Sequence, residues 1–149
     1  MKVTDFMTKN VTTCRDTQTV SDAAKAMLDL GVSVMPILDS GDKLVGIVTQ
    51  SDFIGREVEI PHALASIKRL FGMDYNLGDV EEIYKKAKNK PLTEIMTKNV
   101  TTVTSDYSLT AVVELMMKKQ LKRIPVCDGD KLVGIITRKD ILKAFEGMK

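Results

Sequence analysis

The sequence predicts an α+β fold made of two copies of one strand-helix-strand-strand-helix unit, packed about a pseudo-two-fold axis with a helical insert between them. Two repeats predict the duplication: residues 7–13 (Met-Thr-Lys-Asn-Val-Thr-Thr) recur as residues 96–102, and residues 41–47 (Gly-Asp-Lys-Leu-Val-Gly-Ile) recur as residues 129–135. Self-similarity at a nearly constant spacing is typical of a duplicated structural unit. The expected boundaries are residues 1–58 for the first copy, 59–92 for the insert and 93–149 for the second copy.

Each copy contains the same order of predicted elements. Thr19 and Asp22 fit a capping box at the start of a helix, whose apolar face follows in residues 23–30, and residues 109–117 form the corresponding face in the second copy. A hairpin and a closing helix come next. The expected ranges are a strand at 11–13, hairpin strands at 33–38 and 43–49 and a helix at 51–58, and in the second copy 100–103, 122–127, 131–137 and 139–146.

Prolines mark the remaining elements. Pro36 and Pro125 fall inside the first hairpin strand of each copy, and they predict a sheet-edge position for that strand because proline has no N–H to donate. In the insert, a helix is expected between Pro61 and Gly72, and a second helix at residues 79–88. The amphipathic insert can either pack on its own chain or form a dimer face.

Composition limits the classes of protein that this chain can belong to. Its 149 residues are close to the roughly 150 of one domain, and 44% hydrophobic residues are enough to form a core. The formal charge of +2 disfavours general nucleic-acid binding. Two cysteines are too few for a disulfide framework and indicate a cytoplasmic protein. No stretch approaches the roughly 18 apolar residues of a membrane span, so direct membrane insertion is not expected.

Two strand-to-helix junctions carry the main chemical signal, and both read Gly-Ile-x-Thr-x-x-Asp. A glycine within a strand indicates that another backbone or a ligand approaches closely. The helix start offers N–H groups to an anion, and the aspartate can accept hydrogen bonds from the vicinal hydroxyls of a ribose. Thr-x-x-Asp is also the pattern of a capping box, in which the two residues bind each other's backbone. Both interpretations stay open for Thr49 with Asp52 and for Thr137 with Asp140.

The two copies differ in charge around these junctions. The second copy has four cations where the first has neutral residues: Lys122, Arg123, Arg138 and Lys139 replace Ser33, Val34, Gln50 and Ser51. Charge-assisted hydrogen bonds are roughly twice as strong as neutral ones, so a phosphorylated ligand should favour the cleft that these cations line. If the copies pack face to face, cations of one copy can serve a ligand whose ribose is held by the other. Lys122 and Lys139 are expected to be solvated.

The segment Gly-Asp-x-Leu-Val-Gly-Ile-x-Thr-x-x-Asp, found twice after a Met-Thr start, a helix and a strand with proline, resembles the CBS domain family, named after cystathionine β-synthase. The resemblance covers about residues 4–58 and 93–147, and two such domains in one chain resemble a Bateman module. It implies that adenosine-containing ligands bind in clefts between the repeats, that the protein regulates an associated enzyme, channel or transporter, and that it forms a homodimer.

The resemblance also implies roles for individual residues. Thr49 and Thr137 would contact phosphate, Asp52 and Asp140 would bind ribose, and Arg123 would hold phosphate. The ligand base would lie along the chain that follows each Met-Thr start. The other expected ligand contacts are Arg138, Thr13, Thr102, Val103 and Pro125.

The expected function is therefore a regulatory module that senses an adenine nucleotide (AMP, ADP or ATP) and acts on a separate enzyme or transporter, without a covalently bound cofactor. Two alternatives stay open: a module for protein interaction or dimerisation that binds no nucleotide, and a binder of another adenosine compound such as S-adenosylmethionine. An enzyme is not expected, because the single histidine, His62, has no apparent catalytic partner. A structural zinc site needs four ligands and is not expected either.

Overall fold

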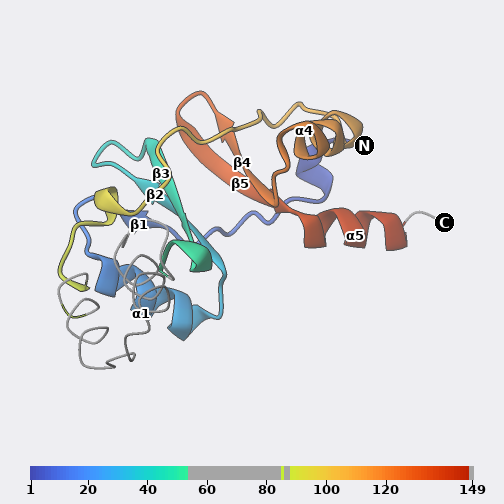
Figure 1. The fold of residues 1–149 in the computed structure, drawn as a ribbon. Coiled ribbons are helices and arrows are strands. Elements are labelled where there is room, and N and C mark those ends of the chain that lie inside the picture. The colour runs from blue at the N-terminus through green and yellow to red at the C-terminus, as the bar shows by residue number, and fades with distance from the viewer. Residues whose placement is uncertain (54–84, 86–87, 148–149) are drawn as a thin grey trace, which may run out of the picture.

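The structure is a computed structural model that describes residues 1–53, 85 and 88–147. The elements follow the predicted order (Figure 1) and confirm the α+β fold. In the first repeat they are η1 (Val3–Asp5), β1 (Cys14–Arg15), α1 (Val20–Leu30), β2 (Val34–Leu38), β3 (Leu44–Thr49) and η2 (Gln50–Phe53). In the second they are η3 (Leu92–Glu94), α4 (Leu109–Lys119), β4 (Arg123–Asp128), β5 (Lys131–Thr137) and α5 (Arg138–Gly147). The two helices expected in the insert, and most of the closing helix expected at residues 51–58, lie outside the described residues.

Local signals explain where α1 begins and ends. The Thr19 hydroxyl accepts a hydrogen bond from the Asp22 amide at 3.2 Å, and the Asp22 carboxylate accepts one from the Thr19 amide at 2.9 Å. This capping box satisfies N–H groups that have no partner within the helix. Gly31 ends α1 in the left-handed region with φ 64°, which glycine adopts without steric cost. In the second repeat Ser108 caps α4.

The sheet-edge prediction is wrong for the first repeat. Strand β2 lies between β1 and β3, pairing parallel with β1 and antiparallel with β3. Strand β1 has only two residues, which pair with Ile37 and Leu38, so Pro36 needs no N–H on that side. The pairing therefore starts at Cys14 rather than within residues 11–13. In the second repeat β4 pairs with β5, and residues 100–103 contribute a single bridge, from Val103 to Val126.

Each repeat supplies residues to the core of the other. Val3, at the start of the first repeat, is 0% exposed and packs in the second core with Leu109 and Val112. Leu92, at the start of the second repeat, is also 0% exposed and packs in the first core with Met35. The two starts are thus exchanged between the repeats, and neither core is complete without the other copy.

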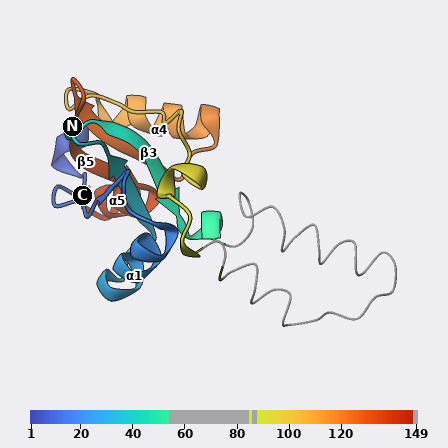
Figure 2. The same cartoon turned by 90° about the vertical axis from the view of Figure 1, so that its left-hand side faces the viewer.

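Backbone hydrogen bonds hold this exchange together in two equivalent places. The Thr8 amide donates to the Ile135 carbonyl at 2.9 Å, and the Ile135 amide donates to the Thr8 carbonyl at 3.0 Å. The same pair of bonds joins Thr97 and Ile47, at 2.9 and 3.0 Å. The equivalent residues Lys43 and Lys131 form a bridge with each other, so the pseudo-two-fold axis passes between them. Figure 2 shows the two hairpins at the centre, with α1 and α4 on opposite sides.

Candidate functional site

Two equivalent clefts open between the repeats. The Thr137 cleft has a volume of about 490 Å³ and the Thr49 cleft about 430 Å³, within the ~300–1,000 Å³ typical of small-molecule sites. The Thr137 cleft is lined by Thr8, Asn10, Val11, Thr12, Gly31, Val32, Ser33, Val34, Lys122, Arg123, Ile135, Thr137, Arg138 and Lys139. The Thr49 cleft is lined by Ile47, Thr49, Ser51, Asp52, Thr97, Asn99, Val100, Thr101, Gln120, Leu121, Lys122 and Arg123. Each cleft is thus built from both repeats.

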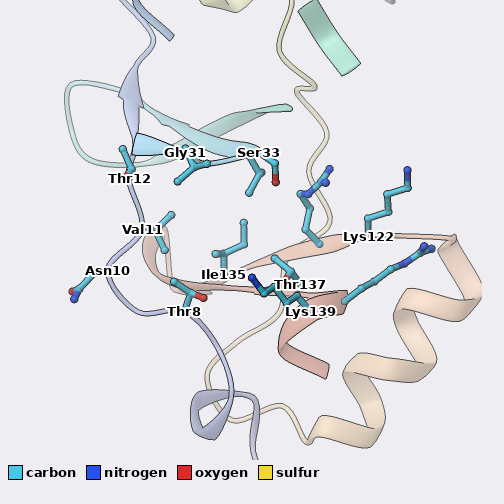
Figure 3. Close-up of a pocket in the computed structure, with 14 residues that line it drawn as sticks. Thr8, Asn10, Val11, Thr12, Gly31, Ser33, Lys122, Ile135, Thr137 and Lys139 are labelled. Atoms are coloured by element: carbon cyan, nitrogen blue, oxygen red, sulfur yellow. The ribbon is translucent and has the colours of Figure 1, made fainter. Parts of the chain in front are cut away.

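Figure 3 shows how the Thr137 cleft is assembled. Thr8, Asn10 and Thr12 come from the extended start of the first repeat, and Ser33 follows the end of α1. Thr137 faces them from the end of β5. The cleft therefore lies where the exchanged start of one repeat crosses the strand-to-helix junction of the other.

The strand glycines are explained by this crossing and not by a ligand. A Cβ atom on Gly134 would lie 2.5 Å from the Met7 sulfur and 2.9 Å from the Thr8 carbonyl oxygen. A Cβ on Gly46 would clash with the Met96 sulfur and would lie 3.1 Å from the Thr97 carbonyl oxygen. The close approach inferred from the sequence is thus made by the Met-Thr segment of the opposite repeat.

Both aspartates of the junctions cap their own helix starts. Asp140 Oδ2 accepts hydrogen bonds from the Thr137 amide at 2.9 Å and its hydroxyl at 3.1 Å, and the Asp140 amide donates to that hydroxyl at 3.3 Å. Asp52 Oδ2 accepts from the Thr49 amide at 2.8 Å and its hydroxyl at 3.4 Å. The capping interpretation is therefore correct for one oxygen of each carboxylate.

The second carboxylate oxygen is open to a ligand only at Asp52, which lines the Thr49 cleft, whereas Asp140 lines neither cleft. Within the described part of the chain, no group donates a hydrogen bond to Oδ1 of Asp52 or of Asp140. The two side chains are only 2% and 4% exposed, yet neither oxygen is a fully buried atom without a partner. A carboxylate accepts through both oxygens, so capping and ligand binding are compatible.

The structure brings together only some of the residues expected to contact a ligand. Thr137, Arg123 and Arg138 line the Thr137 cleft, and Thr49, Asp52 and again Arg123 line the Thr49 cleft. The expected contacts that line neither cleft are Asp140, Thr13, Thr102, Val103 and Pro125.

The positions of these residues explain why they do not line a cleft. Val103 and Pro125 are fully or almost fully buried in the second repeat. The two segments expected to lie along the ligand base do line the clefts, but through Thr12 and Thr101, each one position before the expected Thr13 and Thr102. Asn10 and Asn99 also line the clefts, and the unchanged recurrence of their seven-residue segment is the signal that could have identified them.

The charges of the two clefts differ. The Thr137 cleft is lined by four cations and, among the described residues, by no carboxylate. The Thr49 cleft is lined by Asp52 and by two cations, Lys122 and Arg123, which it shares with the other cleft. Lys122, Arg138 and Lys139 are exposed, and Arg123 is half-buried.

The charge of Arg123 interacts with charged side chains of both junctions, Asp52 and Arg138. Burial lowers the pKa of its guanidinium, Asp52 opposes that shift and Arg138 adds to it. The guanidinium stays protonated at neutral pH even so. A cation of the second repeat thus faces the aspartate of the first, as expected for copies that pack face to face.

The cysteines do not contribute to either cleft. Cys14 and Cys127 are both buried as free thiols, and burial raises the pKa of each. Such thiols react slowly, because the thiolate is the nucleophile. In residues 1–53, 85 and 88–147, no three His, Cys, Asp or Glu side chains gather in a way that could hold a metal ion. His62 lies outside the described residues. None of the described helices has the length and hydropathy to cross a membrane.

Comparisons with known proteins agree with this architecture. An uncharacterised protein, YlbB of Bacillus subtilis, is 33% identical over 141 residues, which are 94% of this chain and 79% of YlbB. The CBS domain pair of protein MJ0100, solved in complex with 5′-methylthioadenosine and S-adenosyl-L-methionine, superposes with a TM-score of 0.71 at 31% identity, covering 100% of this chain and 98% of that one. CBSX2, solved in complex with AMP, shares the fold with a TM-score of 0.73 at 23% identity, covering 97% of this chain and 96% of that one.

The family assignment rests on both repeats. The CBS domain model matches residues 3–59 and 92–147. These ranges include the exchanged starts, both hairpins and both Thr-x-x-Asp junctions. The chain therefore belongs to the CBS domain family and contains a tandem pair of CBS domains.

Proposed function

We propose that this protein is a regulatory sensor of adenine nucleotides (AMP, ADP or ATP) that acts on a separate enzyme or transporter. The observation that carries the proposal is the charge of the clefts between the repeats: Asp52, Lys122 and Arg123 line the Thr49 cleft, and four cations, Lys122, Arg123, Arg138 and Lys139, line the Thr137 cleft. The CBS pairs of MJ0100 and CBSX2 were solved with adenosine compounds, which supports the same ligand class here.

The chemistry of the lining residues suggests how a nucleotide would bind. The Thr49 or Thr137 hydroxyl would turn its single O–H from the aspartate to a phosphate oxygen, and Arg123 or Arg138 would neutralise the phosphate charge. Oδ1 of Asp52 would accept hydrogen bonds from the ribose hydroxyls. Because Asp140 does not line its cleft in this structure, we expect the Thr49 cleft to hold ribose more directly.

Asp52→Asn and Asp140→Asn separate the capping role from the ligand role. An asparagine keeps one acceptor oxygen for the threonine amide and replaces the other by an NH₂ donor. Hydrogen bonds to charged groups contribute about 1.5–3 kcal/mol, so we expect Asp52→Asn to lower AMP affinity in the Thr49 cleft at least about tenfold while the melting temperature changes little. Asp140 lines neither cleft, so Asp140→Asn should lower AMP affinity less. Calorimetric titration with AMP and thermal melting without ligand measure both effects.

The matched control is Asp29→Asn, an exposed substitution of the same chemistry on α1. It should leave AMP affinity unchanged and lower stability by no more than about 0.5 kcal/mol, through loss of its exposed ion pair with Lys25. Unchanged AMP affinity in both Asp52→Asn and Asp140→Asn would remove the ribose role and leave the carboxylates as helix caps only.

A ligand panel distinguishes nucleotides from S-adenosylmethionine. A ligand present at 100 times its dissociation constant stabilises a fold by about 2.7 kcal/mol. The sulfonium cation of S-adenosylmethionine is repelled by the four cations of the Thr137 cleft, whereas phosphates are attracted. We therefore expect AMP and ATP to raise the melting temperature more than S-adenosylmethionine does, and the reverse order would favour the alternative ligand.

A second candidate role, homodimerisation, is favoured by exposed apolar side chains on three helices. They are Leu28 at 83% exposure, Met117 at 75%, Leu142 at 68%, Phe145 at 64% and Leu30 at 56%. Isolated exposed apolar residues are common, but Met117 of α4 and Leu142 of α5 line one shared apolar hollow between these two helices, which indicates an interaction surface there. We propose that a second copy of the chain covers this surface.

Sedimentation tests this homodimer. The wild type should sediment as a dimer, and Leu142→Lys with Phe145→Lys should shift it to a monomer because two charges would be desolvated in the interface. Lys143→Gln, on the same helix, should leave the dimer intact. A wild type that stays monomeric at all concentrations would contradict the proposal.

A further inference from the structure

In the ranges that the structure describes, Arg123 is the one half-buried cationic side chain that lines both clefts. It begins β4 directly opposite Thr137 of β5, and it lines both the Thr137 cleft and the Thr49 cleft. Lys122 also lines both clefts, but it is exposed, so its ammonium group is solvated and less directed. Among the described residues, the Arg123 guanidinium donates no hydrogen bond and forms no ion pair within 4.0 Å.

The two clefts depend on this side chain to different degrees. The Thr137 cleft has two cations of its own, Arg138 and Lys139. The Thr49 cleft has none of its own and contains the carboxylate of Asp52, which repels a phosphate. A phosphorylated ligand in the Thr49 cleft therefore needs Arg123, whereas one in the Thr137 cleft gains from Arg123 but has other partners.

We propose that Arg123 is a specificity-determining residue shared by the two clefts, and that it allows a chain to hold only one phosphorylated ligand tightly at a time. This inference rests on the proposed function. The guanidinium is a planar fork that binds one phosphate bidentately, so it serves a single cleft. Once a phosphate in the Thr137 cleft has engaged it, the Thr49 cleft presents Asp52 without its balancing cation. That cleft then favours an uncharged adenosine compound over a nucleotide.

Ser33→Trp allows this competition to be measured. Ser33 is exposed and lines only the Thr137 cleft, where Figure 3 shows it across from Thr137, so a bulky side chain there should block that cleft alone. Wild type and Ser33→Trp are each titrated calorimetrically with AMP and with adenosine. The two proteins compare the affinity of the Thr49 cleft when the neighbouring Thr137 cleft can hold a phosphate and when it cannot. Backbone NMR signals of Gly46 and Gly134, one beside each junction, report which cleft fills.

The expected result is a difference for AMP and none for adenosine. In wild type, AMP binds the Thr49 cleft while the Thr137 cleft already holds AMP. In Ser33→Trp the Thr137 cleft is blocked, so AMP should bind the Thr49 cleft at least about tenfold more tightly than in wild type. Adenosine should bind the Thr49 cleft equally in both proteins, which also shows that Ser33→Trp is folded. When Arg123→Gln is introduced into both proteins, the difference between them in AMP affinity of the Thr49 cleft should shrink to less than about twofold. The control Lys139→Gln should weaken AMP in the Thr137 cleft and keep the competition, because Lys139 lines that cleft alone.

The outcomes separate this inference from the function on which it rests. If neither AMP nor adenosine binds to wild type, the sensor function fails and the inference fails with it. If both bind, but AMP in the Thr49 cleft is insensitive to the neighbouring cleft, the sensor stands and the shared role of Arg123 is overturned. A competition that persists undiminished in Arg123→Gln also overturns it.

Discussion

Leu92→Ala is expected to lower the free energy of unfolding by about 2–5 kcal/mol, the range for removing a fully buried leucine side chain. Leu92 is 0% exposed, and it belongs to the core formed around Met35 and Val48 of the first repeat. Its removal leaves a cavity in a repeat from which it is distant in sequence. Urea denaturation followed by circular dichroism measures the effect.

Lys98→Ala is the control, because Lys98 is exposed, lines neither cleft and lies in the same exchanged start as Leu92. Substitutions at such surface positions change stability by less than about 0.5 kcal/mol. Because the exchange joins the two cores, we also expect Leu92→Ala to shift a single cooperative transition of the whole chain. Separate transitions for the two repeats, with only one of them shifted, would show that the cores unfold independently.

Gly134→Ala is the second prediction with a large effect, a loss of about 1–3 kcal/mol, the usual cost of forcing extra volume into a packed region. The added Cβ would meet the Thr8 carbonyl oxygen at 2.9 Å, and that oxygen is backbone held by its bond from the Ile135 amide. The clash can be relieved only by separating the two repeats locally. Gly147→Ala, where nothing lies within 4 Å, is the control and should be close to neutral.

Gly46→Ala should cost less than Gly134→Ala. Its closest neighbours are side-chain atoms of Met96, which can adopt other rotamers, and the backbone oxygen of Thr97 lies farther away at 3.1 Å. Combining Gly46→Ala with Met96→Ala should therefore be less destabilising than the sum of the two single changes, and a double-mutant cycle measures this coupling. Equal losses for Gly46→Ala and Gly134→Ala would contradict the assigned contacts.

Much of the fold could be predicted because its signals are local. The cap formed by Thr19 and Asp22 acts over four residues, and the hairpin strands alternate with turns along the chain. The exchange could not be predicted in the same way, since Val3 and Leu92 lie far in sequence from the cores that bury them. Before the exchange of the two starts is known, Gly46 indicates equally well that a ligand approaches the strand closely or that another backbone does.

The candidate site also has a part that local sequence signals predict and a part that depends on how the repeats pack. The repeated junction identified Thr49, Asp52 and Thr137, because their spacing is set within one turn of chain. Which cations accompany which junction depends on how two repeats face each other, and a linear pattern carries no information on that. The position of Arg123 between both clefts could therefore be found only from the structure.

The hydrogen bonds between Thr8 and Ile135, and between Thr97 and Ile47, join residues that also form the walls of the two clefts. A small molecule seated in either cavity therefore rests directly on the seam between the halves. Under the proposed function, a bound nucleotide would hold the two halves together. A second protein that touches both halves would then detect this added rigidity without contacting the small molecule itself.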